Sequence, residues 1–173
     1  NTSLGYFISK FNAEKQIIDC GLNFTIFRPS YIIGKDDLFS KNLKKQMKSG
    51  EIIIPGSGTY SIQPIHVFDV VKVIFESVSQ LKFNNKIIDL VGPDSITYEK
   101  YVKLFSKGTT TKIRKINLED AYHNAIINPK SIFGIDDLNI LIGNFNGNHK
   151  RLSKISKIKF QSVLELLQSS RLL

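Results

Sequence analysis

The sequence contains no tryptophan, one methionine, one cysteine and four arginines among its 173 residues. The single cysteine, Cys20, excludes an internal disulfide and is typical of a reducing compartment. No apolar run approaches the roughly 20 residues of a membrane-spanning helix. The first residues also lack the basic and apolar regions of a secretory signal. We therefore expect a cytoplasmic protein without a transmembrane segment, whose core forms without a disulfide or a metal.

The net charge of +9 raises the question of nucleic-acid binding, but the kind of basic residue argues against it. Only four of the 24 basic residues are arginine, which is the preferred residue for bidentate contacts to phosphates and bases. Abundant isoleucine and asparagine, with only three alanines, indicate an AT-rich codon bias that supplies lysine regardless of function. We therefore expect no nucleic-acid partner.

The positive charge is concentrated near the C-terminus. Residues 1–100 carry a net charge of +2, whereas residues 101–173 carry +7. The densest basic stretch is 150–159, which contains Lys150, Arg151, Lys154, Lys157 and Lys159. This stretch is either a solvated face or a docking surface for an acidic partner or a membrane surface.

Hydrophobic periodicity predicts alternating helices and strands, followed by small helices. Helices are expected at 6–20, 38–49, 69–81, 97–107, 118–127 and 135–142, with a last helix that begins at the capping-box pair Ser162 and Glu165. Strands are expected at 23–28, 51–55, 61–67, 86–91 and 112–116. Gly56 to Gly58 is interpreted as a hairpin connection, Asp69 as a helix N-cap and 143–149 as a polar loop. The order predicts part of an open α/β sheet followed by a smaller lobe.

Tyr6 and Lys10 lie four residues apart, and therefore on one face of the first expected helix. An ammonium group beside a phenol favours the phenolate, and such a phenol can exchange a proton with a substrate hydroxyl or carbonyl. The spacing alone is weak evidence, because six tyrosines among many lysines produce such pairs by chance. Tyr31 with Lys35 is a second pair of this kind.

The residues around this pair give it a context. The chain contains, in order, Tyr6-Phe-Ile-Ser-Lys10, Ala13-Glu14, Gly21-Leu22, Arg28-Pro29, Gly34, Gln63-Pro-Ile-His-Val-Phe-Asp-Val70, and Ile88-Asp-Leu-Val-Gly-Pro-Asp94 with Ile96-Thr97. This order resembles the short-chain dehydrogenase/reductase superfamily, in its extended and atypical branch. That branch includes NAD-dependent epimerases and dehydratases, NmrA-like proteins and the accessory subunit of respiratory complex I. The resemblance covers roughly residues 4–107.

The resemblance implies a fold and a division of the chain. Residues 1–107 would be the C-terminal part of a Rossmann-like NAD(P)-binding domain, with interleaved segments of the substrate lobe. This part would be the later half of a doubly wound parallel sheet. Residues 108–173 would form a smaller, mostly helical substrate lobe and tail.

The resemblance also implies roles for individual residues. Tyr6 would be the general acid/base, and Lys10 would tune it and hydrogen-bond the nicotinamide ribose. The residues that would lie beside the nicotinamide are Arg28, Pro29, Ser30 and Tyr31, and those near the substrate cleft are Gln63 and His66. Structural interpretations remain open, with Pro29 ending a strand and His66 as a satisfied structural histidine.

Two parts of the family pattern are absent from the sequence. The G-x-x-G-x-x-G loop that binds the dinucleotide phosphates does not occur, and the family's serine upstream of the tyrosine would precede Asn1. We therefore expect a C-terminal portion of a larger chain, in which NAD or NADP binding requires an N-terminal half. A degenerate, non-catalytic relative is the alternative.

Two functions follow. The first is part of an NAD(P)-dependent oxidoreductase, epimerase or dehydratase that acts on a small-molecule hydroxyl or carbonyl substrate through Tyr6 and Lys10. The second is a non-catalytic dinucleotide-binding sensor or assembly subunit, with a protein partner or a second copy of the chain. No metal site is expected, because Cys20 and the three histidines show no ligand spacing.

Overall fold

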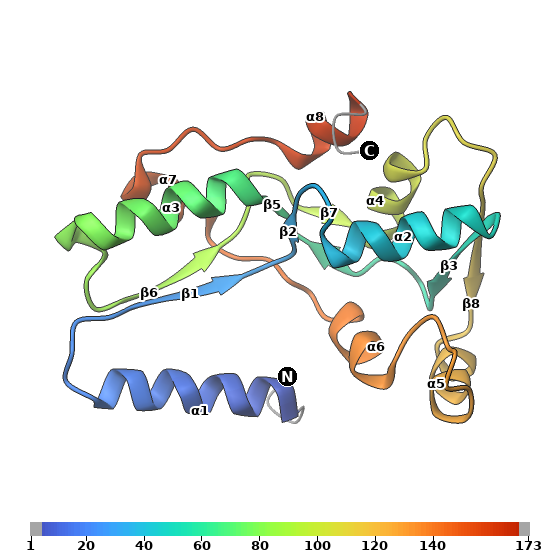
Figure 1. The fold of residues 1–173 in the computed structure, drawn as a ribbon, viewed down its shortest axis with the longest axis horizontal. Coiled ribbons are helices and arrows are strands. Elements are labelled where there is room, and N and C mark those ends of the chain that lie inside the picture. Colours follow the sequence, from blue (N-terminus) through green and yellow to red (C-terminus); the bar gives the residue numbers. More distant parts are fainter. Residues whose placement is uncertain (1–4, 170–173) are drawn as a thin grey trace.

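A computed structural model describes residues 5–169 (Figure 1). The strands are β1 (Thr25–Pro29), β2 (Ile32–Ile33), β3 (Glu51–Pro55), β4 (Ser61–Ile62), β5 (Ile65–His66), β6 (Lys86–Leu90), β7 (Ile96–Thr97) and β8 (Lys112–Ile116). The helices are α1 (Gly5–Asp19), α2 (Leu38–Lys48), α3 (Val67–Ser79), α4 (Tyr98–Phe105), α5 (Leu118–Ile127), α6 (Ile135–Leu141), α7 (His149–Ser156) and α8 (Val163–Gln168), with a 3-10 turn, η1, at Leu81–Phe83.

Most strand pairs are parallel. β1 pairs with β6, β2 with β5 and β3 with β8 in parallel, whereas β4 and β7 are antiparallel. Parallel partners need crossover connections, and helices such as α3 and α4 supply them along the chain. The predicted α/β fold with parallel strand pairing is therefore confirmed.

Two apolar clusters hold these elements together. One lies among α3, β6 and α7 and includes Phe83, Ile88 and Leu152. The other lies among β3, α4, α6 and α8 and includes Tyr101 and Leu138. Burying one side chain of this size contributes about 1.5–3 kcal/mol relative to leaving it exposed. Burial of these clusters therefore stabilises the arrangement of the strands and helices, and with it the positions of the connecting loops.

Three local predictions are wrong. The strand expected at 61–67 is split into β4 and β5, because Pro64 has no N–H to donate to a ladder. Gly56 to Gly58 does not close a hairpin, since β3 pairs with β8 and β4 pairs with β7. His66, rather than Asp69, holds the N-cap position of α3, and Asp69 lies in the first turn.

Helix α7 was not expected in the basic stretch 150–159. Its N-cap is Asn148, whose side-chain oxygen accepts a hydrogen bond from the Arg151 backbone N–H at 2.9 Å. Leu152 is fully buried in the cluster with α3 and β6, whereas Lys150 and Lys154 are exposed. Leu152, Ile155 and Ile158 therefore anchor the stretch, and its lysines face outward.

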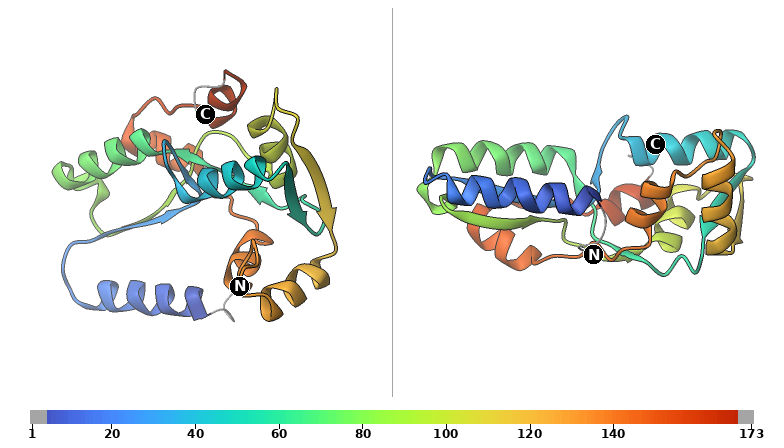
Figure 2. Two further views of the ribbon diagram at one scale, coloured as in Figure 1. Left: turned by 45° about the vertical axis from the view of Figure 1, so that its right-hand side comes forward. Right: turned by 90° about the horizontal axis from the view of Figure 1, so that it is seen from below.

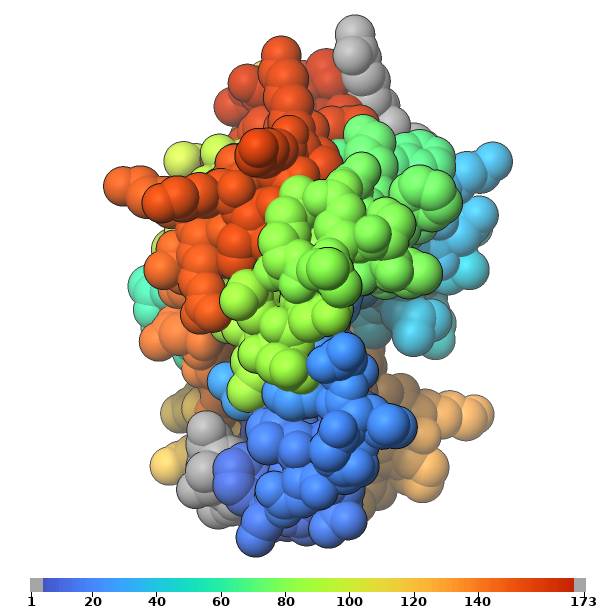
Figure 3. All heavy atoms as spheres, turned by 90° about the vertical axis from the view of Figure 1, so that its left-hand side faces the viewer, coloured from blue at the N-terminus to red at the C-terminus, as the bar shows by residue number. Residues whose placement is uncertain are grey.

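Helices α1 and α3 expose apolar side chains. Figures 1 and 2 show α1 along one margin of the molecule, and Figure 3 shows it projecting beneath β6 and α3. None of its described side chains is buried. On α3, Phe75 is 74% exposed and Val78 is 85% exposed. Large apolar side chains exposed in this way are typical of interaction faces, and no other element within residues 5–169 covers them.

None of the helices within residues 5–169 combines the length and hydrophobicity needed to cross a membrane.

Candidate functional site

Tyr6 and Lys10 lie together on α1. The Lys10 Nζ atom is 5.6 Å from the centroid of the Tyr6 ring, which is within the range of a cation–π contact. The Tyr6 side chain is half exposed, and its ring packs edge-on against Phe7 with centroids 5.2 Å apart. The structure thus brings the predicted pair together at an accessible face. The catalytic role of the pair stays a prediction.

An ion pair connects α1 to β1. The Arg28 guanidinium donates two hydrogen bonds to the Glu14 carboxylate, one of them from Nε to Oε1 at 2.9 Å. These hydrogen bonds hold the pKa of Glu14 below its ordinary value and raise the pKa of Arg28. Glu14 therefore fixes the helix that carries Tyr6 against the strand that ends at Pro29.

A small cavity of about 180 Å³ lies where β1 and β6 end. Open α/β sheets bind ligands at the carboxyl ends of their strands, so its place fits a cofactor site. Its volume is below the roughly 300–1,000 Å³ of a complete small-molecule site, and it can therefore hold only part of a dinucleotide. Its lining residues are Arg28, Pro29, Ser30, Asp89, Val91, Asn144, Phe145 and Asn146.

Three of the four residues predicted beside the nicotinamide line this cavity, namely Arg28, Pro29 and Ser30. Tyr31 lies outside it. The cofactor-binding role of all four stays a prediction.

The loop before α7 closes the small cavity through Phe145. The Phe145 carbonyl accepts hydrogen bonds from Ser30 Oγ at 2.9 Å and from the Gln63 N–H at 3.1 Å. The Gln63 side chain accepts from the Gly147 N–H at 2.9 Å and donates to the Gly92 carbonyl at 2.8 Å. The Gln63 amide thus connects this loop to the segment that follows β6. Its predicted contact with substrate stays a prediction.

His66 ends β5 and lines neither cavity. It is 8% exposed, and its Nδ1 atom is buried with no hydrogen-bond partner among the described residues. Burial lowers its pKa, while the neighbouring Asp69 carboxylate opposes the change. The ring is therefore neutral at pH 7. Its Nδ1 atom is not satisfied, so the simple structural interpretation is incomplete, and its predicted place near substrate remains untested.

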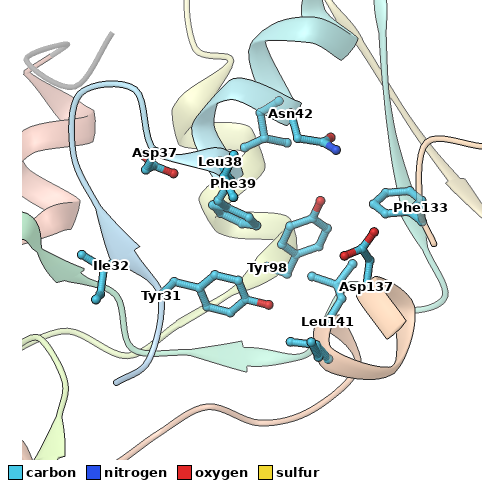
Figure 4. Close-up of a pocket in the computed structure, with 12 residues that line it drawn as sticks. Tyr31, Ile32, Asp37, Leu38, Phe39, Asn42, Tyr98, Phe133, Asp137 and Leu141 are labelled. Atoms are coloured by element: carbon cyan, nitrogen blue, oxygen red, sulfur yellow. The ribbon is translucent and has the colours of Figure 1, made fainter. Parts of the chain in front are cut away.

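A larger cavity of about 440 Å³ lies between α2, α4 and α6 (Figure 4). Tyr31 lines it, and burial raises the pKa of Tyr31 to about 12, with the nearby Asp137 carboxylate adding to the shift. The residues that line this cavity are Tyr31, Ile32, Asp37, Leu38, Phe39, Asn42, Leu43, Tyr98, Phe133, Asp137, Ile140 and Leu141.

Aromatic rings connect the helix of Tyr6 to the larger cavity. The Phe7 and Phe145 rings stack with centroids 6.3 Å apart, and Phe145 meets Tyr31 edge-on at 5.8 Å. Tyr31 in turn contacts Phe39, with centroids 4.8 Å apart. Phe145 therefore lies between α1 and the cavity and is part of both surroundings.

Sequence reasoning missed Phe145 and the residues that line the larger cavity. The segment from Gly143 to His149 was interpreted only as a polar loop, although one aromatic residue in a polar loop is a signal of packing. Tyr98 and Asp137 carry no local motif, because they meet only through the fold. Within residues 5–169, no three histidine, cysteine, aspartate or glutamate side chains are grouped so that they could hold a metal ion.

No protein-family model matches this chain. A curated relative from Dictyostelium discoideum is NADH dehydrogenase (ubiquinone) 1 alpha subcomplex subunit 9, mitochondrial. It is 26% identical over 110 residues, which are 64% of this chain and 31% of the relative.

Solved structures match most of the described fold. One is an NADPH-dependent quinone oxidoreductase from Escherichia coli, solved with NADPH. The match covers 97% of this chain and 60% of that protein, with a TM-score of 0.72 and 17% identity. Another is a nucleoside-diphosphate-sugar epimerase from Staphylococcus aureus. That match covers 91% of this chain and 56% of the epimerase, with a TM-score of 0.68 and 16% identity.

At these identities the likeness establishes the fold. The chain has a Rossmann-like α/β fold similar to that of these proteins, as the resemblance in the sequence predicted. It spans between 31% and 60% of the length of these relatives.

Proposed function

We propose that this chain is part of an NAD(P)-dependent oxidoreductase, epimerase or dehydratase that acts on a hydroxyl or carbonyl substrate. The observation that carries the proposal is the placement of Lys10 Nζ over the exposed Tyr6 ring, on a helix tied by Glu14 to β1. The end of β1 borders the small cavity. A phenol, an ammonium group and a partial ring site therefore occur in one region of the fold.

In this proposal, Tyr6 exchanges a proton with the substrate oxygen, and Lys10 supplies a positive charge beside the phenol and a hydrogen bond to the nicotinamide ribose. The bound nicotinamide supplies hydride chemistry. Arg28, Pro29 and Ser30 orient the ring, since they line the small cavity. Tyr31 lines the larger cavity, and in this proposal Gln63 and His66 lie near the substrate.

The proposal includes a second half of the Rossmann sheet that carries the phosphate-binding loop. The uncovered apolar faces of α1 and α3 support it, because such faces are normally buried against further structure. The proposed division keeps 1–107 as the later part of the NAD(P)-binding domain and 108–173 as the substrate lobe. The choice between NAD and NADP belongs to residues outside this chain.

The alternative function is a non-catalytic dinucleotide-binding assembly subunit or sensor. The name of the Dictyostelium relative, a subunit of NADH dehydrogenase, favours it. In this case the exposed basic side chains of α7 would contact an acidic protein partner, or a second copy would cover an apolar face.

The compartment is also a proposal. The exposed, unpaired Cys20 fits a reducing compartment such as the cytoplasm, whereas the relative's name places that protein in mitochondria. Imaging of the tagged full-length protein distinguishes the two.

The Tyr6→Phe and Lys10→Met variants of the full-length natural protein test catalysis. We expect Tyr6→Phe to lower the turnover of NAD(P)H with a panel of carbonyl compounds at least about 100-fold, because general acid–base catalysis contributes 10²–10⁴-fold. Cofactor binding, followed by NADPH fluorescence, is expected to persist in Tyr6→Phe.

Lys15→Met is the matched control, since Lys15 is another exposed lysine of α1, and it should retain activity. Undiminished turnover in Tyr6→Phe would reject the catalytic proposal. Cofactor binding without turnover in the unmodified protein would instead support the assembly subunit.

A further inference from the structure

The larger cavity is built for recognition of a ring. Tyr31, Phe39 and Tyr98 line one part of it, with the Phe39 ring 4.8 Å from Tyr31 and 5.8 Å from Tyr98. Figure 4 shows Phe133 and Leu141 on the other part. Its volume of about 440 Å³ lies within the roughly 300–1,000 Å³ of small-molecule sites.

The hydroxyl of Tyr98 is available to a ligand in the cavity. Tyr98 is only 1% exposed, lines the cavity, and its hydroxyl makes no hydrogen bond with any residue from 5 to 169. Burial raises the pKa of Tyr98 and of Tyr31, so both hydroxyls stay protonated and can donate. A ligand acceptor in the cavity could take the hydrogen bond of the Tyr98 hydroxyl in place of water.

The charged residues of the cavity are acidic. Asp37 and Asp137 line it, and none of the twelve described lining residues is lysine or arginine. The Asp37 carboxylate accepts hydrogen bonds from the Ser40 and Gly34 backbone, and Asp137 Oδ2 accepts from the Gly134 N–H at 3.0 Å. Neither carboxylate forms an ion pair among the described residues. Their negative charges are therefore balanced only by backbone N–H groups, which for Asp37 include the N-terminus of α2, and not by a cationic side chain.

We propose that this cavity binds a ring-bearing small molecule without negative charge, and that it rejects nucleoside diphosphates and other anions. Aromatic walls contact the ring, the Tyr98 hydroxyl donates to an acceptor on the ligand, and the two carboxylates repel anions and attract a cation. A diphosphate would need arginine, lysine or a free helix N-terminus, whereas Asp37 occupies the N-cap of α2 at this cavity.

As a statement about substrate, this inference rests on the proposed function. It names the substrate class as an uncharged or cationic carbonyl or hydroxyl compound with a ring. The binding of such a ligand in the cavity can be tested separately, because measuring it requires no enzymatic turnover.

The experiment compares probes that share one ring system and differ in charge. We would titrate the full-length protein with 2-naphthol, 2-naphthylmethylammonium, 2-naphthoate and UDP, and measure dissociation constants by calorimetry. We expect naphthol and the ammonium probe to bind at least about tenfold more tightly than naphthoate and UDP, because like charges in contact are strongly unfavourable.

Three variants locate the binding. Tyr98→Phe should weaken naphthol binding, while Tyr60→Phe, which lies outside the cavity lining, should not. Asp37→Asn combined with Asp137→Asn should narrow the difference in affinity between naphthol and naphthoate. Asparagine keeps one acceptor oxygen, so the N-cap hydrogen bond to Ser40 and the hydrogen bond to Gly134 can be retained, whereas that from Gly34 to Asp37 is lost. Thermal midpoints confirm that each variant is folded.

Binding of naphthoate or UDP as tight as that of naphthol would overturn the inference, as would absence of naphthol binding or its indifference to Tyr98→Phe. Loss of turnover in Tyr6→Phe leaves the probe measurements unchanged. An active enzyme with an anion-preferring cavity would overturn this inference alone.

Discussion

His66 has a buried ring, and burial disfavours its protonated form in the folded chain. Its pKa is lowered mainly by burial, and Asp69 only partly offsets this. The unfolded chain therefore binds more protons than the folded one from the ordinary histidine pKa of about 6.5 downward. Acidification consequently favours unfolding, and the sign is the reverse of that for a histidine stabilised by an ion pair.

We expect the free energy of unfolding to fall between pH 7 and pH 5 more steeply in the unmodified protein than in His66→Gln. Denaturant titrations across this range measure both slopes. His123→Gln is the control, because His123 is exposed, and it should keep the unmodified slope. Equal slopes in all three proteins would show that His66 does not titrate as its burial requires.

Single residues also mark how far the sequence predicted the site. Tyr6 with Lys10 and the Glu14 motif could be found because each lies within one turn or a few turns of α1. The Tyr98 hydroxyl could not be found from the sequence, because the residues around it come from α2, α6 and β2, which are distant in sequence. Phe145 was missed for the same reason.

At the scale of elements, Asp69 joins α3 to the segment that precedes α8. Its side chain is fully buried, and Oδ2 accepts a hydrogen bond from the Gln161 N–H at 2.7 Å. Lys72 Nζ lies 3.4 Å from Oδ1. The residue predicted to cap a helix thus anchors the C-terminal segment instead.

We expect Asp69→Ala to lower the free energy of unfolding by about 1–3 kcal/mol, because the Gln161 N–H loses its buried acceptor. Chemical denaturation measures this loss. Asp19→Ala at the exposed end of α1 is the matched control and should stay within about 0.5 kcal/mol of the unmodified protein. A similarly small effect of Asp69→Ala would show that the C-terminal segment is held by its apolar contacts.

Elements with many apolar residues were predicted well, and elements with few were not. The bounds of β3, β8 and α5 agree with the predicted ranges, and β3 has the clearest pattern, with Ile52 and Ile54 buried. Helix α7 was missed because only Leu152 and Ile155 interrupt its polar residues. Its stability depends on the Asn148 cap and on packing against β6, neither of which a local pattern reveals.

At the scale of the whole molecule, the exposed apolar faces decide how the isolated chain behaves. Within residues 5–169, Phe75 and Val78 of α3 are exposed to solvent. Large apolar patches on monomers are normally interaction sites. A proposed covering half of the sheet would change their environment from water to protein.

We expect Phe75→Lys with Val78→Lys to reduce dye binding and aggregation of the 173-residue chain without lowering its thermal midpoint. In the full-length protein the same pair should lower the midpoint, because a covered face would then bury two charges. Light scattering and thermal melts measure both. Ser79→Lys, at an exposed polar site of α3, should change neither protein. An unaltered full-length midpoint would mean that the face stays open.

The strand ladders also determine how the chain can reach this structure. Partners in each ladder lie roughly 30 to 60 positions apart in the sequence, and no ladder is a hairpin. Each pairing must therefore close a long loop before its contacts repay the lost chain entropy. Folding of this region is expected to be slow, and its apolar segments stay exposed until the crossovers are complete. During synthesis, the yield of folded protein is therefore expected to depend more on chaperones and on timing than on the final stability.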